Sequence, residues 1–187
     1  MRAFVAMALP QDVQRSLAEL QRELARAGAD VKWVEPANLH LTLKFLDEVS
    51  DEQRAGVEQS LRRLAGGQPA FSVRLGGVGA FPSADSPRVI WVGCAEGGEP
   101  MTQLAEEIER ETSSLGICSS ARPFAAHLTI GRVRSPRHRQ ELARALQEAT
   151  WRAPGPWRVE TLTLYQSVLG SAGPRYTALT EIPLGAA

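Results

Sequence analysis

Two patterns of hydrophobic and polar residues run through the chain, and each predicts one kind of secondary structure. Apolar runs and strict alternation predict strands over residues 2–9, 39–46, 71–79, 88–94, 126–133, 157–165 and 175–181. Apolar residues spaced three and four apart predict helices over residues 11–27, 51–65, 101–114 and 137–149. Turn-forming residues at 82–87 separate two of the strands. Helices and strands are therefore mixed along the whole chain, which is typical of an α+β protein.

The strand predicted over 39–46 has the most regular alternation. Leucine or phenylalanine occupies every odd position, whereas His40, Thr42 and Lys44 occupy the even positions between them. Successive side chains of a strand point to opposite faces, so these three polar residues are expected to share the face that is turned away from the core.

A short motif in this strand occurs twice. His40-Leu41-Thr42-Leu43 recurs as His127-Leu128-Thr129-Ile130. The flanking segments recur at almost the same offset, residues 2–6 with 88–92 and 71–74 with 157–160. The sequence therefore predicts one domain made of two similar α+β halves, approximately 1–87 and 88–187, related by a pseudo-twofold axis.

A pseudo-twofold arrangement would bring two imidazoles and two hydroxyls to one small volume. Imidazole ionises near neutral pH, so one histidine can accept a proton while the other donates one. The hydroxyls of Thr42 and Thr129 can donate hydrogen bonds to the two non-bridging oxygens of a phosphodiester. We therefore expect in-line attack on a phosphodiester, with His40 and His127 as the acid/base pair and with no metal ion or other cofactor.

Other kinds of site have weaker support in the sequence. A metal site would draw on His40, His127, His138 and scattered carboxylates, but no spacing typical of metal ligands is present. A serine hydrolase would need a Gly-x-Ser-x-Gly turn, which is absent. The glycines at 76–79 lack the spacing of a nucleotide-binding loop. A purely structural role for both His-Thr pairs is the remaining alternative.

Composition narrows the class of protein. Lysine and arginine total 21 and so do aspartate and glutamate, which argues against binding nucleic acid through bulk charge alone. No run of 18 apolar residues predicts a membrane span, and the N-terminus does not resemble a signal peptide. Cys94 and Cys118 have no Cys-x-x-Cys spacing. We expect a cytoplasmic protein with reduced thiols, without a membrane partner.

The duplicated motif and its surroundings resemble the 2H phosphoesterase superfamily. Within it, the chain is similar to the bacterial and archaeal RNA 2′,3′-cyclic phosphodiesterases, also called 2′-5′ RNA ligases. The strings that carry the likeness cover nearly the whole chain and lie at 2–6, 38–46, 79–82, 88–93, 127–132 and 164–167. Two positions depart from the family, which usually has glycine where Asp47 lies and proline where Ala126 lies. Both departures leave every expected catalytic group in place.

The resemblance implies a bilobal α+β fold, in which two antiparallel sheets flank a central cleft and the helices lie outside. It implies hydrolysis of a terminal RNA 2′,3′-cyclic phosphate to a 2′-phosphate. His40 would be the proton donor, His127 the proton acceptor, and Thr42 and Thr129 the phosphate-binding residues. An RNA 5′-hydroxyl attacking in place of water would give ligase activity. A 2H relative acting on a 2′-5′ oligoadenylate or a cyclic ADP-ribose derivative, and a non-catalytic module that binds RNA ends, stay open.

Two further side chains are candidates for substrate binding. The family has a substrate-contacting arginine at the position of Arg132, but strict alternation places this residue on the face opposite His127 unless the strand bulges near Gly131. Lys44, on the predicted face of His40, could contact RNA phosphates.

The remaining expectations concern the surroundings of the site. The basic run at 132–139 could attract an RNA strand, and Trp91 is expected in the core. Trp33, Phe81 and Tyr165 are left open as base-stacking residues. The expected partners are RNA ends or small cyclic nucleotides. A monomer without an obligate protein partner is favoured, because one chain already supplies both halves of the site.

Overall fold

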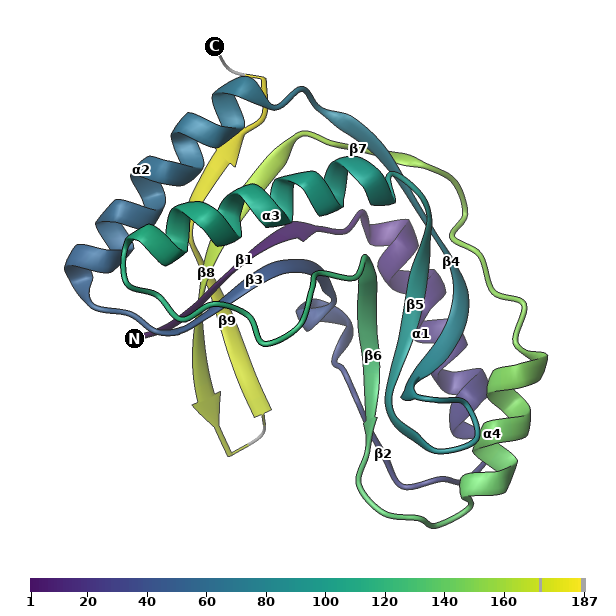
Figure 1. The fold of residues 1–187 in the computed structure, drawn as a ribbon. Helices are drawn as coiled ribbons and strands as arrows, with labels where there is room; N and C mark the ends of the chain where they lie inside the picture. The colour runs from purple at the N-terminus through teal and green to yellow at the C-terminus, as the bar shows by residue number, and fades with distance from the viewer. Residues whose placement is uncertain (172, 186–187) are drawn as a thin grey trace.

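The computed structural model describes residues 1–171 and 173–185 (Figure 1). Its α-helices are α1 (Gln11–Ala25), α2 (Asp51–Gly67), α3 (Gly98–Ser114) and α4 (Arg139–Glu148), and a short 3-10 helix, η1, covers Pro36–Asn38. Its strands are β1 (Arg2–Ala8), β2 (Val31–Trp33), β3 (His40–Glu48), β4 (Phe71–Pro82), β5 (Pro87–Glu96), β6 (His127–Val133), β7 (Trp157–Val159), β8 (Thr161–Gly170) and β9 (Gly173–Pro183). Every predicted element is present. Differences lie in the short β2, η1 and the break between β7 and β8, where one strand was predicted.

The strands form two antiparallel sheets. The first sheet has the order β3-β1-β8-β9, and the second has the order β2-β6-β5-β4-β7. Helices α2 and α3 contact the first sheet, whereas α1 and α4 contact the second. The α+β class with two antiparallel sheets is therefore confirmed. The division into equivalent halves at about residue 87 stays a prediction.

Each sheet takes strands from both parts of the sequence. In the first sheet β1 pairs with β8, and in the second β5 pairs with β4. The orders β3-β1-β8 and β6-β5-β4 correspond position by position under the expected pseudo-twofold relation. The two motif-bearing strands, β3 and β6, occupy equivalent places in these orders.

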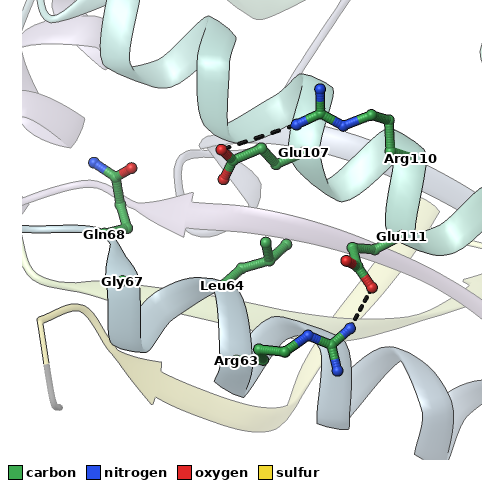
Figure 2. Close-up of a pocket in the computed structure, with 7 residues that line it drawn as sticks. All are labelled: Arg63, Leu64, Gly67, Gln68, Glu107, Arg110 and Glu111. Carbon is green, nitrogen blue, oxygen red and sulfur yellow. Dashed lines mark hydrogen bonds and ion pairs between the residues drawn. The ribbon is translucent and has the colours of Figure 1, made fainter.

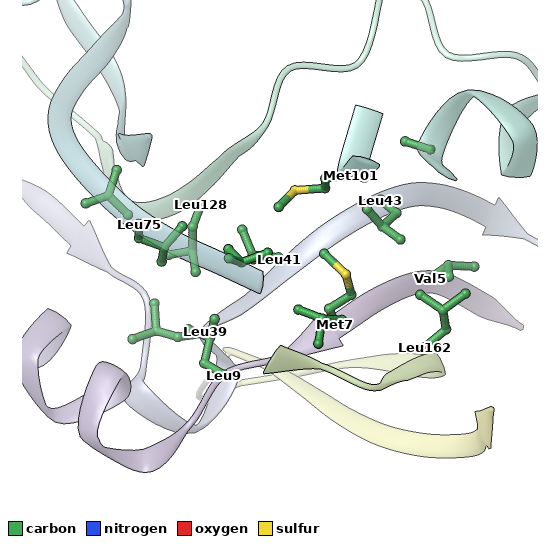
Figure 3. Close-up of a cluster of buried hydrophobic side chains, with 14 of the residues drawn as sticks. Val5, Met7, Leu9, Leu39, Leu41, Leu43, Leu75, Met101, Leu128 and Leu162 are labelled. Carbon is green, nitrogen blue, oxygen red and sulfur yellow. The ribbon is translucent and has the colours of Figure 1, made fainter. Parts of the chain in front are cut away.

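A continuous apolar core joins the two sheets and their helices. In the first sheet Leu41 and Leu43 alternate with the polar motif residues and are buried. Figure 3 shows them in one cluster with Leu75 and Leu128 of the second sheet and with Met101 of α3. Burial of one face of each strand fixes its orientation, because a shift of one residue would expose the leucines.

Local signals define the helix boundaries. Ser50 caps α2, since its hydroxyl accepts a hydrogen bond from the backbone N–H of Gln53, whose side chain in turn accepts one from the backbone N–H of Ser50. Gly28 and Gly116 adopt positive φ just beyond α1 and α3, where the left-handed conformation is readily available to glycine. Within the described residues, no helix is both long and apolar enough to cross a membrane.

Candidate active site

Each His-Thr pair opens a strand and lies on its uncovered face. His40 begins β3, where His40 and Thr42 are paired with Ala8 and Ala6 of β1. Their side chains are partly exposed, whereas Leu41 between them is buried. We call the side of the first sheet that carries His40 and Thr42 the His40 face.

The second pair has the same arrangement. His127 begins β6, where His127 and Thr129 are paired with Gly93 and Trp91 of β5. Both side chains are partly exposed, and Leu128 between them is buried. This side of the second sheet is the His127 face. The structure therefore presents both motifs as the alternation predicts.

The two motif-bearing strands meet where the sheets join. Strands β3 and β6 contact each other, although they belong to different sheets. The positive charge of Arg132 on β6 acts on the hydroxyl of Tyr176 on β9, so these residues are near each other across the junction. Asn38, just before His40, donates a side-chain hydrogen bond of 3.0 Å to the carbonyl of Pro174 at the start of β9.

Backbone carbonyls orient the two imidazoles in the same way. Nδ1 of His127 lies 2.6 Å from the carbonyl oxygen of Ala125, two residues earlier. The His40 ring forms a backbone hydrogen bond with Asn38, again two residues earlier. A carbonyl can only accept, so the ring nitrogen that faces it carries the proton. In His127 this arrangement leaves Nε2 free for a ligand or a reacting group.

Aromatic rings surround His40. Its ring stacks on Phe4 at a centroid distance of 4.7 Å, meets Tyr176 edge-on at 5.1 Å and lies 5.9 Å from Tyr165. Burial by these neighbours lowers the pKa of His40 to about 4, and the hydrogen bond with Asn38 opposes the shift. His40 is therefore neutral in the free protein at neutral pH.

The sequence leaves the role of Tyr165 open and gives no sign that Phe4 and Tyr176 contact His40. Their contact with His40 depends on strand pairing that no local pattern shows. Burial raises the pKa of the Tyr176 phenol, against the attraction of Arg132 and Arg2. The phenol is therefore protonated at neutral pH.

Fewer aromatic residues surround His127. Phe81 of β4 meets its ring edge-on at 5.2 Å, and Trp91 lies 6.5 Å away. The prediction that Trp91 is a core residue is wrong, because its indole is partly exposed on the His127 face and covers Gly79. Trp33, which the sequence left open as a base-stacking residue, packs against Gly131.

A bulge in β6 turns Arg132 toward the motif. Gly131 pairs with Ile90 and Thr129 with Trp91, so Ile130 is an extra residue in the ladder. Arg132 then pairs with Val89, which shares a face of β5 with Trp91. Arg132 is consequently exposed on the His127 face, as the expected bulge near Gly131 requires.

An equivalent bulge in β3 makes the prediction for Lys44 wrong. Lys44 pairs with Val5 and Thr42 with Ala6, which leaves Leu43 as the extra residue. The alternation changes phase after Leu43, so Lys44 points into the protein and is only 2% exposed. Phe45, instead of Lys44, lies on the His40 face, and it is 61% exposed. Counted from the histidine of each motif, Phe45 is the counterpart of Arg132.

The ammonium group of Lys44 is fully engaged inside the protein. Its Nζ donates to Glu109 of α3 at 2.7 to 2.8 Å, to the carbonyl of Cys118 at 2.9 Å and to the hydroxyl of Ser120 at 3.3 Å. Lys44 thus ties β3 to the loop that leads into His127. Its ammonium group is buried and bound to protein groups, so it is not exposed for contact with RNA phosphates.

The two described surface hollows lie away from both motifs. One of about 300 Å³ separates α2 from α3, where Arg63 pairs with Glu111 and Arg110 with Glu107 (Figure 2). The other, of about 340 Å³, lies at the start of α4 around His138. Neither contains His40 or His127, and in the first each arginine is neutralised by a glutamate.

Within residues 1–171 and 173–185, no group of three or more potential metal-binding side chains is present. In the same residues the hydroxyls of Thr42 and Thr129 form no hydrogen bond with another protein group. Both hydroxyls are therefore available to a ligand.

One of the two departures from the family has a clear conformational context. Asp47 has a φ of 53°, in the left-handed region that favours glycine. Aspartate tolerates this region better than most residues. Asp47 also lies 3.8 Å from the guanidinium of Arg2. Nothing in the structure explains the alanine at 126.

Comparison with known families agrees with this geometry. The family described as LigT like Phosphoesterase matches the chain twice, over residues 7–91 and 92–176. Together the two matches cover most of the chain, including both motifs. This chain belongs to the LigT-like 2H phosphoesterase family.

Several LigT-like relatives match over nearly their whole length. The RNA 2′,3′-cyclic phosphodiesterase of Archaeoglobus fulgidus is 38% identical, with 96% of this chain and 98% of the relative covered. That of Methanothermobacter thermautotrophicus is 36% identical, with 94% and 95% covered.

Solved structures show the same fold. A protein of Thermus thermophilus matches with a TM-score of 0.83 and 31% identity, covering 99% of this chain and 98% of its own. E. coli LigT matches with a TM-score of 0.75 and 31% identity, covering 98% and 96%. E. coli LigT has also been solved with 3′-AMP.

Proposed function

We propose that this LigT-like protein hydrolyses RNA 2′,3′-cyclic phosphate ends to 2′-phosphomonoesters. The observation that carries the proposal is the equivalent placement of two His-x-Thr pairs, each on the uncovered face of its strand, where the two sheets join. The names of the relatives support the substrate, since they are RNA 2′,3′-cyclic phosphodiesterases.

In this proposal the four motif residues divide the reaction between them. His127 removes a proton from water as the water oxygen forms a bond to phosphorus. The bond from phosphorus to O3′ breaks, and His40 donates a proton to O3′, which leaves the phosphate on O2′. Thr42 and Thr129 donate hydrogen bonds to the non-bridging oxygens. Each proton-transfer group typically contributes about 10²–10⁴ to the rate.

The surroundings of His40 imply when it becomes an acid. Its pKa of about 4 means that the free protein holds it neutral at pH 7. An anionic phosphodiester beside the ring favours the imidazolium and raises the pKa. His40 therefore gains its proton as the substrate binds. An NMR titration of the His40 ring should show a higher pKa with bound 3′-AMP than without it, and an unchanged pKa would contradict this step.

Turnover of a cyclic nucleotide in the presence of EDTA tests the proposed function. A 2′,3′-cyclic nucleotide should be hydrolysed at an undiminished rate in chelator, because no step uses a metal ion. The product should be the 2′-phosphate, identified by comparison with both isomers. A 3′-phosphate product, or loss of turnover in EDTA, would contradict the mechanism. Tight binding of RNA ends without turnover would identify a binding module instead.

A further inference from the structure

The loop that leads into His127 runs back along the helix before it (Figure 1). This loop, residues 115–126, contains no helix or strand, and we call it the connecting segment. At its start the backbone N–H of Ile117 donates to the carbonyl of Thr112 on α3 at 3.2 Å. At its end the Cβ of Ala126 lies 3.9 Å from the position that a Cβ of Gly98, the first residue of α3, would occupy. The connecting segment therefore follows α3 in the reverse direction and delivers the chain to β6.

Glu109 of α3 anchors the middle of the connecting segment. Its carboxylate accepts hydrogen bonds from the backbone N–H of Ser120 at 3.0 Å and from the hydroxyl of Ser120 at 2.8 Å. The same carboxylate pairs with Nζ of Lys44 at 2.7 Å. Burial alone would raise the pKa of Glu109, but the hydrogen bonds from Lys44 and Ser120 lower it, so the group is ionised at neutral pH. One charged group thus holds both the segment and the lysine.

Lys44 extends this network to the strand that carries the first motif. It lies two residues after Thr42 on β3, and its Nζ atom also donates to the carbonyl of Cys118 at 2.9 Å and to the hydroxyl of Ser120 at 3.3 Å. The lysine is 2% exposed, so these charged hydrogen bonds form away from water, where electrostatic interactions are stronger. The connecting segment is therefore fixed relative to β3 as well as relative to α3.

The connecting segment also contains the carbonyl that orients His127. Nδ1 of His127 lies 2.6 Å from the carbonyl oxygen of Ala125, five residues after Ser120. This carbonyl holds the proton on Nδ1, which leaves Nε2 unprotonated and able to accept a proton from water. A shift of the segment would move the carbonyl and turn the ring, and a reacting group misplaced by about 1 Å can lose about 10² in rate.

We propose that Lys44 and Glu109 are positioning residues, which hold the connecting segment so that the Ala125 carbonyl keeps His127 in the tautomer with Nε2 free. The consequence for catalysis rests on the proposed function, in which His127 is the base. An ion pair outside both motifs thereby sets the orientation of the base, and it ties that base to the strand that carries the proposed acid.

The tautomer of His127 provides a test that does not depend on activity. Long-range ¹H–¹⁵N spectra of the labelled protein should show the neutral His127 ring with its proton on Nδ1. Glu109→Ala removes both the anchor of Ser120 and the partner of Lys44, so the ring should become a mixture of the two tautomers. On a 2′,3′-cyclic nucleotide, kcat should fall about 10- to 100-fold, while KM should change less than about threefold because the phosphate-binding threonines are unaltered.

Two further substitutions separate positioning from stability. Ser120→Ala removes an exposed hydroxyl that contacts both charged groups but leaves the ion pair intact, so Tm should hardly change while kcat falls about two- to fivefold. Ser120→Thr keeps a hydroxyl and should restore kcat. Glu111→Ala, two residues along α3 from Glu109, breaks an ion pair with Arg63 of α2 instead. It is the matched control and should change neither the His127 tautomer nor kcat.

An unchanged His127 tautomer in folded Glu109→Ala would overturn the inference, as would an equal loss of kcat in Glu111→Ala. If Glu109→Ala does not fold, Ser120→Ala decides, and an unchanged tautomer and kcat in that variant would overturn the inference. A changed tautomer with full activity would leave the positioning role standing and contradict the proposed function of His127 as the base. Absence of turnover by the unsubstituted protein would likewise contradict only the proposed function.

Discussion

The two motif-bearing strands share a backbone plan but differ in what surrounds their histidines. Both begin with the histidine, both carry threonine two residues later, and both contain a bulge at the next apolar residue, Leu43 or Ile130. His40 is enclosed by aromatic rings and held neutral, whereas His127 meets Phe81 and Trp91 on a more open face. Similar backbones thus place the two imidazoles in different surroundings, which suits the proposed acid and base.

The bulges are also stabilised from equivalent helix positions by different chemistry. Gln21 of α1 donates hydrogen bonds of 2.8 and 2.9 Å to the carbonyls of Val34 and Ile130, the latter in the bulge of β6. Near the bulge of β3, Glu109 of α3 binds Lys44. An uncharged side chain therefore binds the bulge of β6, whereas an ion pair lies at the bulge of β3.

Removing either imidazole should have the largest effect. His40→Asn and His127→Asn should each lower kcat on a 2′,3′-cyclic nucleotide by about 10² or more, because each removes one proton-transfer group. Circular dichroism and the urea midpoint serve as controls for folding. Full activity in either folded variant would show that the proposed pair does not act as acid and base.

The pH dependence of stability should report the burial of His40. The pKa of His40 is about 4 in the folded protein and near 6.5 when unfolded, so the unfolded state binds the proton more tightly. The stability that neutral His40 preserves is complete above pH 6.5 and is lost as pH falls toward 4, by about 2–3 kcal/mol.

Urea unfolding at pH 7 and pH 4.5 measures this difference. His40→Asn should lose less stability on acidification than the unsubstituted protein. Carboxylates contribute equally to both proteins and cancel in the comparison. Identical losses would place the pH dependence elsewhere.

Loss of the ion pair near the bulge of β3 should lower the free energy of unfolding more than loss of the amide hydrogen bonds at the bulge of β6. Lys44→Met leaves Glu109 without its buried partner and should cost about 2–4 kcal/mol of unfolding free energy. Gln21→Leu leaves two carbonyls without a donor and should cost about 1–3 kcal/mol. The double variant Lys44→Met/Glu109→Leu should recover part of the loss. Equal or greater destabilisation in the double variant would mean that the pair itself is not the source.

The smallest effect is expected at Asp47, whose counterpart in the other strand does not adopt positive φ. Asp47→Gly should raise the free energy of unfolding by about 0.5–1 kcal/mol, because it relieves a left-handed conformation. Loss of the exposed contact with Arg2 should offset little of this gain. Asp47→Ala, with the same loss of charge but no relief of φ, is the control, and a stabilised alanine variant would refute the explanation.

Local patterns predicted the elements and the faces of all four motif residues, because alternation and helical spacing depend on near neighbours. They failed at Lys44 because a bulge depends on pairing between strands. The partner that holds Lys44 inside the protein, Glu109, lies 65 residues away. The sequence alignment of β1 with β5 is also wrong by one residue. Phe4 pairs with Phe45, and Val89 pairs with Arg132, the counterpart of Phe45, so Phe4 corresponds to Val89 and not to Ile90.

The aromatic residues around His40 could not be predicted from local sequence patterns either. Tyr176 comes from a different hairpin, and Arg132 approaches it from the other sheet. A glycine next to the apolar residue was a usable signal for the bulge in β6, whereas the equivalent place in β3 holds a lysine. The charge of Lys44 led to the prediction that its side chain is exposed to solvent. Its burial is explained by Glu109 of α3, which packs against it.

The exchange of strands between the sheets has a consequence for any shortened form of the protein. A chain that stops near residue 86 contains β1 and β3 but lacks β8, and it contains β4 without β5. One edge of β1 and both edges of β4 would then lack their hydrogen-bonded neighbours. The second sheet is complete only when the chain has been made through β7, and the first only through β9, so both sheets depend on the C-terminal part of the sequence.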